Sequence, residues 1–235
     1  MTSPYTAPTS RTVLVTGGSG FVGGHLIAHL REIGWQVRGI GRSAASRAAV
    51  AAKGAEPWDA DLSDPAALER AMAGVDTVFH VAAHFKLWGP RRLFRAMNVA
   101  GTRNVVSAAQ RAGVRRVVYV SAAAVVMGRP EPQRAVTEDL PLRRMGFAPY
   151  STSEAEAEKI LRAASGRRKG FSTVAIRQHS AGKVCDQVTT VTSDPGKRSD
   201  PLGFMRKAAR SAAGTAGESR KPWAIRQPMA RSNSP

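Results

Sequence analysis

The 235-residue sequence predicts an α/β fold built on a doubly wound parallel sheet. The first observation is an apolar run at 12–15, followed by a glycine-rich turn and by apolar residues at helical spacing from 21 to 30. The second is that short apolar runs alternate with helical patterns from residue 11 to residue 177. This alternation is typical of parallel strands joined by crossover helices that cover both faces of the sheet.

Local signals justify the elements in chain order. Gly34 ends the first helix. Asp64 followed by Pro65 is a strong helix start, because Asp caps free N–H groups and Pro is tolerated in the first turn. The run 116–120 is almost entirely apolar, as a central parallel strand should be. We therefore expect strands at 12–15, 36–40, 55–58, 76–83, 116–120 and 172–176, and helices at 21–30, 44–53, from 65 onward, at 91–112 and at 149–164.

The chain divides into three parts by composition. Residues 1–10 are rich in Thr, Ser and Pro, and we expect them to be disordered. Residues 11–177 are expected to form one folded domain. Residues 178–235 have no clear strand or helix period and predict a basic, largely irregular tail. Two origins stay open for this tail, which are translation in a shifted reading frame and a natural basic linker.

The formal net charge of +18 raises the question of nucleic acid as a partner. Residues 1–177 contain 25 Lys and Arg against 13 Asp and Glu, and residues 178–235 contain 10 against 4. The excess is scattered arginine rather than a stripe with interleaved aromatic residues. Nucleic-acid binding is therefore disfavoured.

Other bulk features predict a cytoplasmic protein with no membrane partner. A single cysteine, Cys185, excludes an internal disulfide and fits a reducing compartment. The longest apolar stretch, 117–127, is too short to cross a bilayer. The first ten residues lack the apolar core of a signal peptide.

The turn at 16–23 has the composition of a phosphate-binding loop. Its glycines let the backbone turn sharply and approach a pyrophosphate, and the helix that follows offers free N–H groups and a partial positive charge. An ordinary strand-to-helix turn is the alternative, but the strand before it and the helix after it are the context that dinucleotide binding requires. The sequence predicts a cofactor site that includes Gly17, Gly20, Phe21, Val22 and Gly23.

The end of the second predicted strand bears on the choice of cofactor. In dinucleotide-binding folds an acidic residue there accepts hydrogen bonds from the adenosine ribose, whereas an arginine accommodates a 2′-phosphate. Residues 36–55 contain no Asp or Glu, and Arg42 follows the strand. Arg42 therefore predicts NADP, with NAD as the alternative cofactor and a solvated surface position as the alternative role of the arginine.

Five spaced motifs follow one another along the chain, which are TGxxGFxG at 16–23, DL at 61–62, HVAA at 80–83, NVxGTxNV at 98–105 and Tyr150. Together they resemble those of the extended short-chain dehydrogenase/reductases. The nearest branches are the 3β-hydroxysteroid dehydrogenases, the dihydroflavonol reductases and the NAD-dependent epimerase/dehydratases. The resemblance ends after residue 177. It implies a Rossmann-type NAD(P)-binding domain in a truncated chain, whose C-terminal substrate domain is missing or replaced by the irregular tail.

The resemblance implies roles for residues outside the glycine turn. Asp61 and Leu62 would flank the adenine of the cofactor, and Ala82 and Ala83 would border its ribose. Asn98 would brace the sheet near the active site.

The resemblance also implies a catalytic tyrosine, Tyr150, that acts as general acid and base. Relatives assist it with a lysine four residues later on the same helix face, where this chain has Glu154. A carboxylate there is expected to raise the pKa of the tyrosine, the reverse of what the lysine does. Ser121 is the candidate hydroxyl after the fifth strand, although relatives place theirs one or two residues later, where this chain has alanine.

Three functions follow from these residues. The first is an NAD(P)-dependent oxidoreductase or epimerase acting on a hydroxyl or ketone of a steroid-like, flavonoid-like or sugar substrate. The second is a nucleotide-binding remnant without turnover, and the third is a basic nucleic-acid-associated protein. We expect no metal site, because the pairs His25/His29 and His80/His84 lack further ligands. A homodimer stays open.

Overall fold

The computed structural model describes residues 11–126, 140–178 and 188–192. They form one seven-stranded sheet in the order β3-β2-β1-β4-β5-β6-β7. The first six strands are parallel, and β7 pairs antiparallel with β6. The strands are β1 (Thr12–Thr16), β2 (Gln36–Ile40), β3 (Glu56–Trp58), β4 (Thr77–His80), β5 (Arg116–Ala122), β6 (Ser172–Gln178) and β7 (Val188–Thr192).

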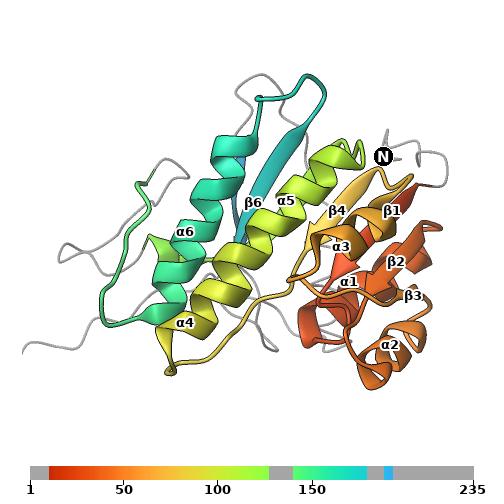
Figure 1. Ribbon diagram of the computed structural model, residues 1–235, viewed down its shortest axis with the longest axis horizontal. Helices are drawn as coiled ribbons and strands as arrows, with labels where there is room; N and C mark the ends of the chain where they lie inside the picture. Colours follow the sequence, from red (N-terminus) through yellow and green to blue (C-terminus); the bar gives the residue numbers. More distant parts are fainter. Residues whose placement is uncertain (1–10, 127–139, 179–187, 193–235) are drawn as a thin grey trace, which may run out of the picture.

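Helices cover both faces of the sheet, which confirms the doubly wound α/β prediction. Buried side chains of α1 and α2 pack with β1 and β2 on one face. Those of α3, α5 and α6 form a larger core on the other face, where α5 and α6 run side by side (Figure 1). The helical segments are α1 (Phe21–Glu32), α2 (Ala44–Ala51), α3 (Pro65–Met72), α4 (Arg91–Phe94), the π-helix η1 (Arg95–Ala100), α5 (Gly101–Arg111), the 3₁₀ turn η2 (Ala123–Val125) and α6 (Pro149–Ala164).

The predicted start and stop signals act as the sequence indicates. The Asp64 carboxylate caps α3 by accepting hydrogen bonds from the N–H groups of Ala66 and Ala67, each at 3.0 Å. Gly34 follows α1 with φ +84°, a conformation that glycine adopts without steric cost.

The strand order reverses between β1 and β4. The chain runs outward from β1 through β2 to β3, then returns to the other side of β1 as β4. The connections therefore leave β1 and β4 in opposite directions. Ligands of open parallel sheets bind at such a reversal point.

Several local features differ from the sequence-based expectation. β4 ends at His80 rather than at residue 83, and β5 continues to Ala122. The helix expected at 91–112 contains the π-helical turn η1, and β6 continues to Gln178. No clear strand is expected in the tail, yet β7 forms within it. The valines of this segment are too sparse to predict a strand from an alternating apolar pattern. The strand is defined instead by its backbone pairing with β6. Residues 1–10 and the other parts of the tail lie outside the described residues.

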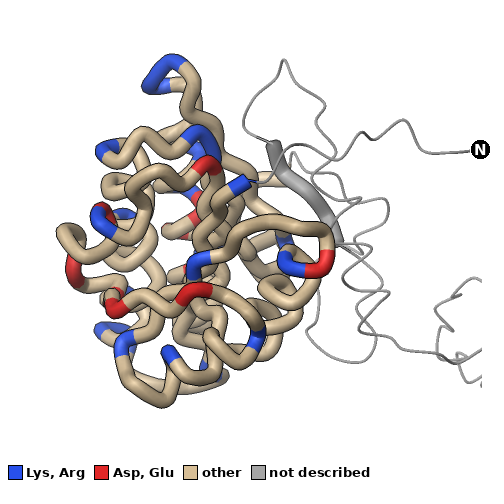
Figure 2. Tube along the Cα trace, turned by 90° about the vertical axis from the view of Figure 1, so that its right-hand side faces the viewer, with Lys and Arg blue, Asp and Glu red and all other residues tan. Residues whose placement is uncertain are grey.

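Basic side chains are distributed over the fold rather than gathered into one stripe. Figure 2 shows Lys and Arg at many separate points of the chain, with Asp and Glu between them. Several arginines are paired with carboxylates, including Arg115 with Asp76 and Arg111 with Glu69, each at 2.6 Å.

Candidate active site

The glycine turn between β1 and α1 lies against the loop that follows β4. Gly17 has φ +71°, and a Cβ atom there would lie 2.8 Å from the backbone N of Ala82. A Cβ atom on Gly23 would lie 2.2 Å from the carbonyl oxygen of Gly17. Larger side chains are therefore excluded at both positions, and the turn can pack closely against the backbone of Ala82.

The N-terminus of α1 points its free backbone groups out of this turn. Its N-cap residue is Gly20, which has no side chain to occupy the first N–H groups, and no acidic residue lies in the first turn. Phe21 is exposed there and contacts the His25 ring, with centroids 4.5 Å apart. Val22 is half-buried in the same turn. An uncapped helix N-terminus of this kind is suited to bind a phosphate group.

A buried chain of hydrogen bonds holds the turn in place. The Thr16 hydroxyl oxygen accepts from the N–H groups of Val81 and Ala82, each at 3.0 Å. The same hydroxyl therefore donates to Nδ1 of His80 at 2.8 Å. The other ring nitrogen of His80, Nε2, then carries the proton and donates to the Thr102 hydroxyl at 3.0 Å.

His80 is thus a neutral tautomer that ties α5 to the loop after β4. Burial lowers its pKa to about 4, which keeps the ring uncharged at neutral pH. Ala82 lies at the centre of this arrangement, and Ala83 follows it on the surface. The sequence did not predict this chain of hydrogen bonds, because Thr16, His80 and Thr102 belong to three separate elements.

The three residues expected around the adenosine differ in burial. Arg42 is exposed at the end of β2 and lies close enough to Asp61 for its charge to help lower the pKa of that carboxyl. The main cause of the lowered pKa is the hydrogen bond from the Ser63 hydroxyl to Asp61, at 2.7 Å. Leu62 is buried, and its carbonyl accepts a hydrogen bond from Nδ2 of Asn104 at 2.8 Å.

Asn98 connects the loop after β4 to α6. Its side-chain oxygen accepts from the His84 N–H at 2.7 Å, and its Nδ2 donates to the Ser153 hydroxyl at 2.9 Å. Asn98 is buried within the π-helix η1. It therefore ties the loop after β4 to the helix that carries Tyr150, whereas the resemblance implied a brace for the sheet.

Tyr150 lies in the first turn of α6 and is partly buried. The ring of Phe85 meets it edge to face, with centroids 4.9 Å apart. Burial raises the pKa of the Tyr150 hydroxyl far above its ordinary value, and the nearby Glu154 adds to this shift. The predicted effect of Glu154 on the tyrosine pKa is confirmed in direction, but burial is the larger cause.

Glu154 points into the protein interior. Its Oε2 accepts a hydrogen bond from the Tyr119 hydroxyl at 2.7 Å, and its Oε1 is buried with no hydrogen-bond partner among the described residues. Burial raises the pKa of Glu154 to about 8, so the carboxyl carries a proton at neutral pH. Lys159, on the same helix, is exposed and does not replace the missing lysine.

Ser121 donates its hydroxyl hydrogen to Glu158. The distance to Oε2 is 2.9 Å, and both side chains are buried. Glu158 also accepts from Nη2 of Arg177 at 2.9 Å and from Nη2 of Arg162 at 2.8 Å. Ser121 is therefore engaged in a buried ion-pair network that joins β5, β6 and α6.

The structure thus brings part of the predicted site together. The glycine turn meets Ala82 on the loop after β4, with Arg42 and Asp61 near the end of β2. Tyr150, in α6, lies beside Phe85 of the same loop, and Ser121 is bonded into the sheet–helix interface. The network around Glu158 was missed by the sequence, although Glu154 and Glu158 at i,i+4 on a helix with buried alanines gave a signal for it.

Comparison with known proteins places this arrangement in a family. The profile of the 3-beta hydroxysteroid dehydrogenase/isomerase family matches residues 14–194, which is more than half of the chain. The chain belongs to this family. The membership agrees with the extended short-chain dehydrogenase/reductase resemblance of the motifs.

Individual relatives in the family cover the same region. The chain is 40% identical over 164 residues to a 4-hydroxy-2-methyl-3-oxo-4-farnesyl-3,4-dihydroquinoline-1-oxide ketoreductase of Stigmatella aurantiaca, covering 69% of this chain and 48% of that protein. It is 38% identical over 172 residues to a 3 beta-hydroxysteroid dehydrogenase/Delta 5-->4-isomerase of Mycobacterium tuberculosis, covering 70% of this chain and 45% of the relative. The chain therefore spans about half the length of the curated relatives it matches.

Solved structures also match this chain over about half of their own length. A short-chain dehydrogenase/reductase superfamily protein from Agrobacterium tumefaciens, with bound NAD, matches with a TM-score of 0.61 and 35% identity over 74% of this chain and 51% of that one. A dTDP-glucose 4,6-dehydratase from Streptomyces venezuelae, also with NAD, matches with a TM-score of 0.60 and 29% identity over 68% and 53%.

The fit of the site to a dinucleotide rests on the chain's own geometry. The turn closes to within a Cβ contact of Ala82, and the N-terminus of α1 that follows it has no side-chain cap. No group of three or more His, Cys, Asp or Glu side chains within residues 11–126 and 140–178 could hold a metal ion. None of the described helices is long and apolar enough to cross a membrane.

Proposed function

We propose that residues 11–178 bind a nicotinamide dinucleotide and that the chain is an oxidoreductase-type protein acting on a hydroxyl or ketone. The observation that carries the proposal is the Gly17–Gly23 turn beside Ala82, followed by the uncapped helix α1. The NAD named with solved relatives supports this cofactor class. The names of the relatives support a small-molecule substrate, either steroid-like or a nucleotide sugar.

We propose NADP as the preferred form of the cofactor. Arg42 is exposed at the end of β2 and forms no hydrogen bond or ion pair with the rest of the described chain. The neighbouring Arg47 is instead held by Asp59 at 3.0 Å. A 2′-phosphate near Arg42 would gain a charge-assisted hydrogen bond, whereas NAD would not.

In the enzymatic form of this proposal, Tyr150 moves the proton. A bound nicotinamide dinucleotide supplies or accepts the hydride. The Tyr150 hydroxyl donates a proton to the substrate oxygen during reduction and accepts one during oxidation. Asn98 and Ser153 hold its helix against the loop after β4. Ser121 would be the hydroxyl donor only if it left Glu158, to which it is bonded.

The local chemistry favours slow turnover. The raised pKa of Tyr150 makes the hydroxyl a poor proton acceptor near neutral pH, and the buried Glu154 offers no positive charge to counter this. A nucleotide-binding protein without turnover is therefore the second candidate function. In either form we propose a cytoplasmic location and leave a homodimer as an additional proposal.

The test is a fluorescence titration of the full chain with NADPH and with NADH. Saturable binding that favours NADPH is the expected result. Failure of a folded sample to bind either nucleotide would overturn the proposed function.

A second experiment separates the two candidate functions. Reduction of a ketone panel with NADPH is compared between the wild-type chain and the variant Glu154→Lys. Measurable turnover in either supports the enzyme, and activity that appears only in the variant assigns the defect to residue 154. Nucleotide binding without turnover in both supports the binding protein.

A further inference from the structure

An exposed apolar surface lies beside Tyr150, at one end of the sheet. It is formed by the loop between β4 and α4, the start of α4 and the loop before α6. Leu87 and Trp88 are the most exposed, at 77% and 75%, and Phe147 is 74% exposed. The apolar members of this surface, called here the loop patch, are Phe85, Leu87, Trp88, Leu93 and Phe147.

The loop patch has a defined conformation. Phe94 is buried beneath it and meets His84 edge to face at 4.8 Å. Gly89 turns the chain above Phe94 with φ +152°, and the Leu93 N–H donates to the Pro90 carbonyl at 3.0 Å. The Arg91 guanidinium donates to the Gly146 carbonyl, which joins the two loops. Leu87 and Trp88 are therefore held outward by a supported loop.

The exposed charges on the segment that carries Leu87 and Trp88 have one sign, whereas Arg144 on the loop before α6 is paired with Glu156. Lys86, Arg91, Arg92 and Arg95 are all exposed on the same segment. Residues 77–126 and 140–153, which contain the whole patch, include no Asp or Glu. The tail at 178–235, with 10 basic and 4 acidic residues, carries the same sign and is not complementary to this surface.

We propose that the loop patch docks on an anionic lipid surface, with Leu87 and Trp88 entering the headgroup region and the surrounding cations contacting lipid phosphates. Exposed Trp, Leu and Phe beside Lys and Arg are the combination that binds at such interfaces. Charge complementarity selects an anionic surface over a neutral one, because each basic residue near it strengthens binding. The docking is peripheral, and it revises the expectation of no membrane partner, which considered only segments that span a bilayer or lead to export.

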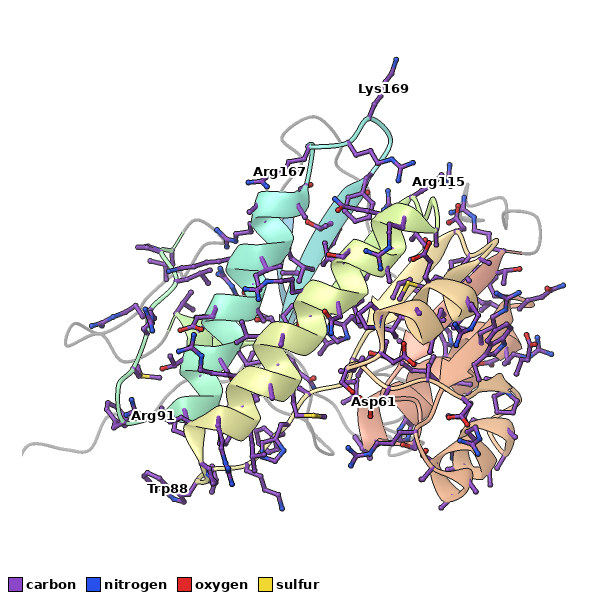
Figure 3. The ribbon with its side chains drawn as sticks, in the orientation of Figure 1. Asp61, Trp88, Arg91, Arg115, Arg167 and Lys169 are labelled. Atoms are coloured by element: carbon purple, nitrogen blue, oxygen red, sulfur yellow. The ribbon has the colours of Figure 1, made fainter. Side chains whose placement is uncertain are left out.

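The opposite end of the sheet provides a matched control. Figure 3 shows Trp88 and Arg91 at one end of the molecule and Arg115, Arg167 and Lys169 at the other. Arg167 and Lys169 are exposed but have no exposed large apolar side chain beside them on their loop. Charge reversal there changes the net charge equally without touching the loop patch.

The experiment measures co-sedimentation of the full chain with vesicles of phosphatidylcholine, alone or mixed with phosphatidylglycerol. Binding to the mixed vesicles only is expected. The double variant Leu87→Ser/Trp88→Ser, which leaves the charge unchanged, should weaken binding about tenfold or more. Lys86→Glu/Arg92→Glu should weaken it at least as much, and Arg167→Glu/Lys169→Glu should weaken it far less.

Tryptophan fluorescence gives a second readout on the same samples. A blue shift on addition of mixed vesicles is expected, and it should be lost in Trp88→Phe, which keeps an aromatic side chain at that position. Circular dichroism confirms that each variant is folded. Equal loss of binding in both charge-reversal variants would mean general attraction of a basic chain and would overturn the proposal. Self-association of the protein without lipid would also overturn the proposal if Leu87→Ser/Trp88→Ser abolished it. The loop patch would then bind a second copy of this chain.

Discussion

The Tyr119 hydroxyl donates a hydrogen bond to Glu154 across the interface between β5 and α6, at 2.7 Å. The residue at the position of the family's lysine is thus part of the protein interior rather than an exposed charge. Glu158, one turn further along α6, raises the pKa of Glu154 as well, although burial is the larger cause. The two carboxyls differ in state, since Glu158 is ion-paired with Arg177 and Glu154 is protonated.

Glu154 should make the protein less stable as the pH rises. The folded state holds the Glu154 proton up to a pKa of about 8, whereas the unfolded chain loses it near 4.5. Between these values the folded state binds more protons, so the free energy of unfolding falls by at most about 1.4 kcal/mol per pH unit. Urea unfolding at a series of pH values from about 5 to about 9 measures this slope.

The variant Glu154→Gln serves as the control for that slope, because the amide does not titrate. Its unfolding free energy should vary less with pH over the same range. An identical slope in the variant would show that another group controls the pH dependence. His80 also has a large shift, but its pKa is lowered from 6.5 to about 4, so between these values it makes stability rise with pH and it has no effect above about pH 6.5. The raised pKa values of Tyr119 and Tyr150 lie above the pH range of the experiment.

The substitution Gly23→Ala should abolish dinucleotide binding. The new Cβ atom would lie 2.2 Å from the Gly17 carbonyl oxygen, which forces the phosphate-binding turn away from Ala82. NADPH fluorescence titration measures the loss. Gly34→Ala is the matched control, because Gly34 has φ +84° but no atom within 4 Å of the position that the new methyl group would take, so it should cost about 1 kcal/mol of stability and leave binding intact.

The substitution Arg42→Ala should reduce the affinity for NADPH about tenfold and leave that for NADH unchanged, because only NADPH carries the 2′-phosphate. Parallel titrations with the two nucleotides give the ratio. Arg47→Ala provides the comparison, since Arg47 is bonded to Asp59 and to the Gly41 carbonyl. A loss of affinity for both nucleotides in Arg42→Ala would indicate damage to the fold rather than lost phosphate recognition.

Removal of the buried carboxylate in Glu158→Gln should destabilise the protein by about 3–5 kcal/mol. Arg177 contacts Glu158 at 2.9 Å, and both side chains are almost fully buried, so the guanidinium would lose its buried counter-charge. Urea denaturation measures the change. Glu69→Gln breaks the exposed pair with Arg111 and should cost less than about 1 kcal/mol; similar costs for the two variants would contradict the importance of burial.

The elements and the glycine turn could be predicted because their signals are local. Asp64, Gly34 and the spacing of glycines at 17, 20 and 23 depend on residues close in the chain. The position of Glu154 was also readable from its distance to Tyr150. The direction of its side chain was not, because its partner Tyr119 is 35 residues away and reaches it only through the packing of α6 on β5.

Other parts of the site depend on contacts that spacing does not encode. The Thr16–His80–Thr102 relay assembles side chains of β1, β4 and α5. The contribution of Phe147 to the loop patch depends on the Arg91–Gly146 contact between two loops that are distant in the sequence.

The two edges of the sheet bear on whether the molecule can add strands from other chains. At one edge, β3 is only three residues long and has Pro57 at its centre, which lacks an N–H group to donate to an added strand. At the other, β7 runs antiparallel and covers the side of β6 that would otherwise be open. Extension of the sheet is therefore hindered at β3, and at the other end the edge available for pairing moves from the seven residues of β6 to the five residues of β7.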